Sequence, residues 1–124
     1  MSLHAELLQY ILRDFSACLL TQPKLTQDAI TVSLNNGVIL TVRYAAADAY
    51  SLRWHGDEAT VGGAQGIDTS PTHPDLATYP NHLHLTNGRV VADPLTHPDA
   101  TPEANVRAVI EALLRDPTLA EFLP

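Results

Sequence analysis

The sequence predicts an α+β domain in which an antiparallel meander sheet of five to six strands carries an N-terminal and a C-terminal helix on one face. Three observations support this fold class. Apolar residues recur at three- and four-residue steps near both ends of the chain, and they alternate with polar residues in the middle. The pairs Asn36-Gly37 and Asn87-Gly88 favour tight hairpin turns. The length of 124 residues fits one domain spanning 1–124.

The first element is an amphipathic helix over about 3–20, which Pro23 ends. Its charged residues interrupt the apolar run, so the segment lacks the continuous apolar stretch of a signal peptide. The single cysteine, Cys18, excludes an internal disulfide and fits a reducing compartment. We therefore expect a cytoplasmic protein. The apolar stripe of this helix consists of Leu3, Leu7, Leu8, Ile11, Leu12, Phe15 and Leu19.

The sheet follows over about 28–92. Two alternating runs flank Asn36-Gly37, and a third strand begins after a turn near Ala47-Asp48. The segment Gly56 to Ser70 is rich in glycine, and a bulged strand over Ala59 to Asp68 is the expectation there. A second hairpin is predicted around Asn87-Gly88. The residues expected on the core face of the first three strands are Ile30, Val32, Leu34, Val38, Leu40, Val42, Tyr44, Tyr50, Leu52 and Trp54.

The last helix is predicted over about 102–115. Thr101 has the side chain of an N-cap, and Pro102 is suited to the first helical position. Asp116-Pro117 stops the helix, and a short terminal turn is expected over 117–123.

Composition and charge limit the partners. Hydrophobic residues make up 45% of the chain and charged residues 17%, without an apolar run near the roughly 20 residues that span a bilayer. We therefore expect no membrane segment. The net charge of −7 repels nucleic acid at long range and suits a basic protein partner better.

The stretch HPDLATYPNHLHL, residues 73–85, holds three of the six histidines. If it ends in a strand, His82 and His84 project from one face, roughly 6 to 7 Å apart, while Leu83 and Leu85 point into the core. Both imidazoles are then expected on the wet face of the sheet, with His73 approaching from the preceding loop.

This spacing leaves three chemical readings open. A metal site needs a third ligand, which His73 or Asp75 is placed to bring across the loop. General acid–base chemistry needs an imidazole titrating near neutrality, with a carboxylate such as Asp68 or Asp75 to orient it. The alternative is that these histidines are ordinary strand and turn residues.

The stretch IDTSPTHPDLATYPNHLHL resembles the signature of the TumE family, small bacterial and archaeal proteins assigned as toxins of type II toxin–antitoxin pairs. In that signature a strand ending in Asp-Asn leads through Ala-Pro-His-His-Pro and Leu-Pro-Thr-Phe-Pro to His-His-Lys-His. The resemblance covers roughly residues 28–115. The matching positions, without a gap, are Asp68, Pro71, His73, Pro74, Leu76, Thr78, Pro80, His82 and His84.

The chain departs from the signature mainly by losing basic residues. Gly66 stands where family members usually carry Arg, and Leu83 replaces Lys; Thr69 replaces Asn, and Thr72 and Asn81 each replace a histidine. Arg53 and Arg89 are candidates to replace the lost charge in space.

The resemblance implies a toxin role, with a helix-turn-helix antitoxin as partner. From the residues we expect a ribonuclease-like reaction that needs no cofactor. Two alternatives stay open: a non-catalytic module that dimerises or engages its partner, and a small metal-binding domain. The candidate catalytic residues are His82, His84, His73, Asp68, Arg53 and Arg89.

Overall fold

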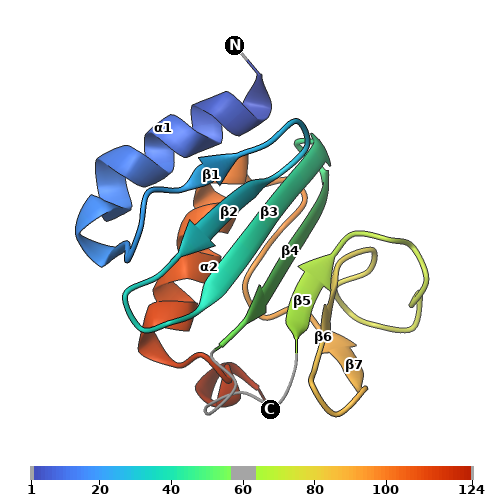
Figure 1. Ribbon diagram of the computed structural model, residues 1–124. Coiled ribbons are helices and arrows are strands. Elements are labelled where there is room, and N and C mark those ends of the chain that lie inside the picture. Colours follow the sequence, from blue (N-terminus) through green and yellow to red (C-terminus); the bar gives the residue numbers. More distant parts are fainter. Residues whose placement is uncertain (1, 57–63, 124) are drawn as a thin grey trace.

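The computed structural model describes residues 2–56 and 64–123. The expected order of helix, meander and helix is confirmed (Figure 1). Over the described residues the sheet has seven strands, all antiparallel and in sequence order. They are β1 (Lys24–Leu25), β2 (Ile30–Ser33), β3 (Ile39–Ala46), β4 (Ala49–His55), β5 (Gln65–Asp68), β6 (His82–His84) and β7 (Val90–Ala92).

The strand count exceeds the prediction because β1 is only two residues long, too short for any alternation to show in the sequence. The predicted bulged strand over Ala59 to Asp68 is described only from residue 64 onward, where β5 covers its last four residues; residues 59–63 of that prediction lie outside the described chain. The described strands show a register shift between Tyr44 and Ala46, at the end of β3.

The N-terminal helix is shorter than expected. Helix α1 (Leu3–Phe15) gives way to the 3₁₀ turn η1 (Ser16–Cys18). Leu19 then forms a bridge with Leu34, and the Leu20 amide donates to the Ser33 carbonyl at 2.8 Å. The helix therefore stops because the next backbone groups bind the end of β2.

The C-terminal elements agree with the prediction. Helix α2 (Pro102–Arg115) has the expected boundaries, and the Thr101 hydroxyl accepts from the Ala104 amide at 3.1 Å. The terminal turn is η2 (Ala120–Phe122). The two expected hairpin glycines, Gly37 and Gly88, both have the positive φ that these turns need, 90° and 86°.

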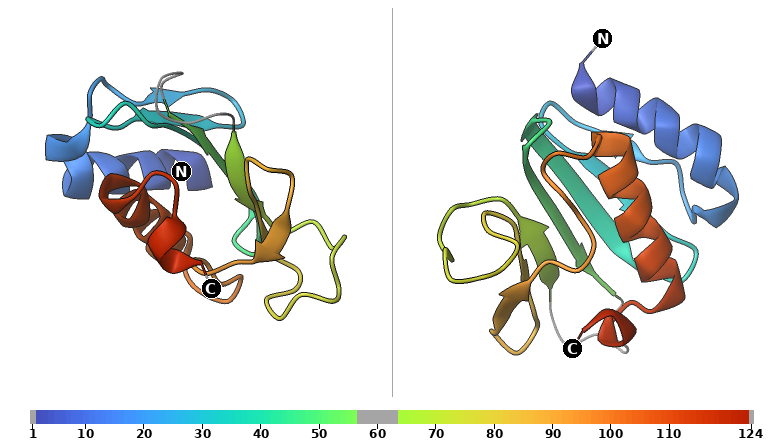
Figure 2. Two further views of the ribbon diagram at one scale, coloured as in Figure 1. Left: turned by 90° about the horizontal axis from the view of Figure 1, so that it is seen from below. Right: turned by 180° about the vertical axis from the view of Figure 1, so that it is seen from behind.

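Both helices lie against the same face of the sheet, and the core fills the space between them (Figure 2). Leu52 of β4, Ile67 of β5 and Leu83 of β6 are in register across three strands, and all three are completely buried. Alternation then sends their sequence neighbours to the opposite face, which the helices do not cover. That uncovered face carries the candidate site.

Candidate functional site

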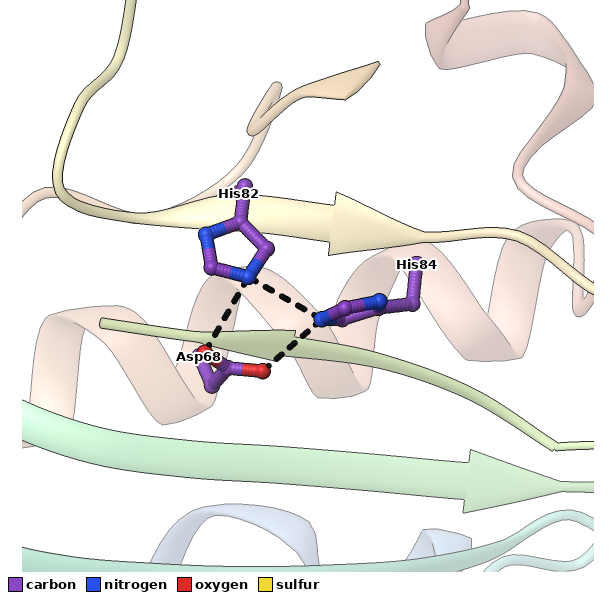
Figure 3. Close-up of side chains that lie close together, drawn as sticks. All are labelled: Asp68, His82 and His84. Atoms are coloured by element: carbon purple, nitrogen blue, oxygen red, sulfur yellow. Dashed lines mark hydrogen bonds and ion pairs between the residues drawn. The ribbon is translucent and has the colours of Figure 1, made fainter. Parts of the chain in front are cut away.

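The pairing of β5 with β6 brings the acidic and imidazole side chains together. Asp68 is the register partner of His82, and Gly66 is the partner of His84. Because directly opposite residues share a face, Asp68, His82 and His84 all project from the uncovered face (Figure 3). We call these three residues the Asp–His–His cluster.

The three side chains converge on one point. The Nε2 atoms of His82 and His84 are 3.0 Å apart. His82 Nε2 lies 3.1 Å from one oxygen of Asp68, and His84 Nε2 lies 3.0 Å from the other (Figure 3). One carboxylate thus spans both imidazoles, a donor set that suits either proton transfer or a metal ion.

Burial differs sharply within the cluster. The side chain of His82 is 1% exposed, whereas that of His84 is 37% exposed and that of Asp68 is 18% exposed. The expectation that both imidazoles lie on a wet surface is therefore wrong for His82. The loop of residues 69–81 accounts for part of this burial, because the His73 ring packs edge-on against His82 with centroids 4.8 Å apart.

The backbone of that loop also holds His82. Its Nδ1 lies 3.1 Å from the carbonyl oxygen of Pro80, two residues before it. A carbonyl oxygen only accepts, so Nδ1 carries the proton of this hydrogen bond. The Nε2 atom is therefore the one that His82 presents to Asp68 and His84.

His73 lies beside the cluster without joining it. Its ring centroid is 6.4 Å from that of His84, and the residue is half-buried. The other acidic residue considered in this loop, Asp75, is exposed and is not one of the three converging residues.

Arg53 stands on the cluster's face of the sheet. It is the register partner of Gly66, which in turn is the partner of His84. A Cβ atom added at Gly66 would lie 3.1 Å from the Arg53 Cγ. The Arg53 stem therefore lies against Gly66, and a side chain at residue 66 would crowd it.

Arg89 does not take the position expected from the sequence. The register partner of His84 is Val90, and the Leu85 amide donates to the Arg89 carbonyl at 2.9 Å. Arg89 is thus paired with Leu85, one residue out of step with the cluster, and alternation places it on the opposite face from His84. It has no role in the site proposed below.

Another cation on this face, Arg43, was not among the predicted site residues. Arg43 of β3 is the register partner of Ser51, and Ser51 is the partner of Asp68. Arg43 lines a shallow hollow of about 250 Å³ whose other walls include Ser51 and Thr69. The sequence could have predicted this position: Val42 and Tyr44 face the core, so strand alternation places Arg43 on the opposite face, as it does Arg53 between Leu52 and Trp54.

A buried polar network holds the strand that carries the histidines. The Asn81 side-chain nitrogen donates to an Asp93 carboxylate oxygen at 2.7 Å and to the Thr96 carbonyl at 2.9 Å. Thr96 in turn bonds Asp93 and, at 2.7 Å, the Tyr50 hydroxyl. Because Asn81 directly precedes His82, this network fixes where β6 begins.

Fold and site together define a small α+β protein that gathers a carboxylate and two imidazoles on the uncovered face of an antiparallel sheet. Comparison with family models matches residues 8–118 to the family described as Toxin TumE. The chain belongs to the TumE family, so the resemblance in the sequence is confirmed, over a longer span than residues 28–115. No curated protein and no solved structure gave a match.

Membership in this toxin family implies an antitoxin partner in general terms. No helix within residues 2–56 and 64–123 is both long enough and apolar enough to cross a bilayer.

Proposed function

We propose that this chain is the toxin of a toxin–antitoxin pair and that it inhibits growth by cleaving RNA at the Asp–His–His cluster. One observation carries the proposal: a carboxylate and two imidazoles meet within about 3 Å on a sheet face that also presents Arg43 and Arg53. Groups that move protons thus lie beside groups that bind phosphate.

The reaction that fits these groups is internal transesterification. The cluster removes the proton of a ribose 2′-hydroxyl, and the 2′-oxygen then attacks the adjacent phosphorus. The bond from phosphorus to the 5′-oxygen breaks, and the leaving oxygen takes a proton from His73. The products are a 2′,3′-cyclic phosphate and a 5′-hydroxyl. Arg53 stabilises the negative charge that develops on the phosphate oxygens.

An acidic chain can bind RNA if its few cations are concentrated where the strand lies. Arg43 and Arg53 belong to neighbouring strands and share the cluster's face, so both reach a backbone crossing β3 and β4. Tyr79, in the loop that covers His82, is 46% exposed and offers a ring on which a base can stack. The shared face of the two arginines and the exposed ring of Tyr79 support single-stranded RNA as the proposed substrate.

The partner we propose is a helix-turn-helix antitoxin encoded beside this gene. A repressor domain of that kind presents a basic surface to DNA, and this chain carries a net charge of −7. Coexpression of the neighbouring protein should restore growth and protect cellular RNA.

The direct test compares His84→Ala with His97→Ala. His84 is the more exposed cluster histidine, so removing it should leave the fold intact, and His97 is an exposed histidine outside the cluster. We expect His84→Ala to lose growth inhibition and to slow RNA cleavage by at least about 100-fold, the usual contribution of a proton-transfer group. His97→Ala should behave like the unmodified chain.

A double variant tests RNA binding. Replacing both Arg43 and Arg53 with Ala should weaken RNA binding and reduce the slope of log affinity against log salt by about 1.4, or about 0.7 for each lost phosphate contact.

If His84→Ala remains fully toxic, the cluster is not the active site. Growth inhibition with intact RNA would instead favour a non-catalytic module that acts by binding.

A further inference from the structure

We propose that Asp68, His82 and His84 bind a divalent transition metal ion of the zinc class. The binding itself is independent of the proposed function, whereas the catalytic use of the ion rests on it. Two features of the cluster support this site: where its protons and lone pairs lie, and how far the two imidazole nitrogens lie from each other and from the carboxylate oxygens.

Proton placement leaves an unbalanced contact in the cluster. Since His82 Nδ1 donates to the Pro80 carbonyl, Nε2 of the neutral ring carries a lone pair. That lone pair faces an Asp68 carboxylate oxygen at 3.1 Å. Two acceptors at this distance repel unless a positive charge lies between them.

His84 cannot resolve both contacts. If its Nε2 is protonated, its single N–H has two acceptors, His82 Nε2 and Asp68, each at 3.0 Å. A second proton on His82 would let each ring donate to a different oxygen of Asp68, but the two N–H groups would then face each other with their nitrogens only 3.0 Å apart. One cation between the two nitrogens and the carboxylate balances all of these lone pairs at once.

The distances match a metal site. An ion about 2.1 Å from each ligand atom, with angles between 90° and the tetrahedral value, sets its ligands about 3.0 to 3.4 Å apart. The two Nε2 atoms are 3.0 Å apart, and each lies close to a different oxygen of Asp68, at 3.1 Å for His82 and 3.0 Å for His84, so both oxygens of the carboxylate face the proposed ion. Two imidazoles and a carboxylate are also the donor set of many catalytic zinc sites and of the facial triad that holds iron.

The surroundings of His82 strengthen the assignment. Metal-bound histidines usually donate their second ring N–H to a carbonyl or carboxylate, which fixes the ring and its tautomer. The Pro80 carbonyl plays that part for His82, whose side chain is 99% shielded from solvent. The geometry needed by a metal ligand is thus built into the strand and the loop before it.

Three protein ligands leave at least one coordination position open, as in catalytic rather than structural zinc sites. His84 is 37% exposed, so solvent and substrate reach the cluster from its side. A hydroxide on the ion would take the proton from the 2′-hydroxyl and become water. His73 stays outside the ligand set and remains free to protonate the leaving oxygen.

The test uses the full chain stripped of metal and titrated with Zn²⁺ by calorimetry. We expect one ion per chain and a higher melting temperature in its presence. His84→Ala and Asp68→Asn should weaken binding by at least about 100-fold, and His97→Ala should bind as the unmodified chain does. Co²⁺ in place of Zn²⁺ should show no thiolate absorption, which excludes Cys18 as a ligand.

RNA cleavage with and without EDTA separates the two proposals. Zinc binding lost in both ligand variants, together with cleavage that EDTA abolishes and Zn²⁺ restores, supports both. Zinc binding without any RNA cleavage supports the metal site and overturns the proposed ribonuclease activity. RNA cleavage that EDTA does not affect but that is lost in His84→Ala supports the ribonuclease activity and overturns the metal site. A calorimetric titration without one-to-one zinc binding also overturns the metal site.

Discussion

At the scale of single residues, burial changes the pKa values of two tyrosines, Tyr44 and Tyr50, on the core side of the sheet. The rings of Tyr44 and Tyr50 lie 5.1 Å apart, and both residues are buried. Burial, with a smaller opposing effect from the hydrogen bond to Thr96, raises the pKa of Tyr50 to about 12. Burial raises the pKa of Tyr44 as well.

These shifts predict a loss of stability in alkali. Each hydroxyl has a higher pKa in the folded chain than the ordinary value of 10.0, so the fold favours the protonated form. Stability from this source is complete below pH 10.0 and falls as the pH rises toward about 12. Urea unfolding at neutral pH and at about pH 11 should show the loss, at least about 1 kcal/mol.

Two phenylalanine variants serve as controls for this pH effect. Both should be less sensitive to alkali than the unmodified chain. Tyr50→Phe should also cost about 1 kcal/mol at neutral pH, because it removes the bond to Thr96. Tyr44→Phe should be nearly neutral there, since that hydroxyl makes no hydrogen bond within the described residues and the nearby Asn105 amide is engaged by the His97 backbone. Equal alkaline losses in all three chains would contradict the assignment.

At the scale of elements, the loop before β6 matters because it both buries His82 and is anchored by Asn81. The Thr78 hydroxyl donates to the Asn81 carbonyl at 2.7 Å and accepts from the Asp93 amide at 2.8 Å. Together with the Asn81 side chain, these bonds tie the loop to the segment that follows β7. The position of the histidines thus depends on contacts twelve to fifteen residues away in sequence.

Asn81→Ala should therefore damage both stability and the site. It removes two buried hydrogen bonds and leaves a carbonyl and a carboxylate less satisfied, which should cost about 1 to 3 kcal/mol of unfolding free energy. Affinity for Zn²⁺ and the rate of RNA cleavage should fall too, because β6 loses its anchor. Asn35→Ala, at an exposed asparagine, is the matched control. Unchanged zinc affinity in a less stable Asn81→Ala chain would show that the cluster holds its geometry without this network.

The same loop shows how far the sequence could predict the site. Strand alternation is a local rule, and it placed His82 and His84 on one face correctly. The burial of His82 depends on how residues 69–81 fold back, which no local pattern encodes. Arg89 was misplaced because a hairpin register that differs by one residue sends a side chain to the other face.

Longer-range pairing explains the remaining differences in the fold. The helix boundaries at residues 102–115 follow from a cap and a stop in the sequence, so they could be predicted. The early end of α1 and the short strand β1 depend on pairing with β2, which the sequence does not show locally. Asp68 faces His82 only because β5 and β6 pair in one register, although thirteen residues separate the strands.

At the scale of the whole molecule, the net charge of the chain and the charge beside the cluster have opposite signs, so they favour different partners. The chain carries 14 acidic and 7 basic residues, yet the uncovered sheet face presents Arg43 and Arg53 beside the cluster. The proposed basic antitoxin would therefore be attracted to the molecule as a whole, whereas the proposed RNA substrate would be attracted to the two arginines beside the cluster. The two partners should respond differently when the two arginines are removed.

Affinity for the antitoxin should accordingly fall as salt rises and should not be weakened by removing the two arginines. Raising ionic strength from about 0.1 M to about 1 M shortens the screening length from about 10 Å to about 3 Å, which weakens attraction between oppositely charged surfaces. Replacing Arg43 and Arg53 with Ala makes the chain more acidic, so antitoxin binding should hold or improve while RNA binding weakens. Surface plasmon resonance at several salt concentrations measures both. An antitoxin affinity that ignores salt would indicate an apolar interface, and one that falls with the double variant would place the antitoxin on the cluster's face, where it would block RNA directly.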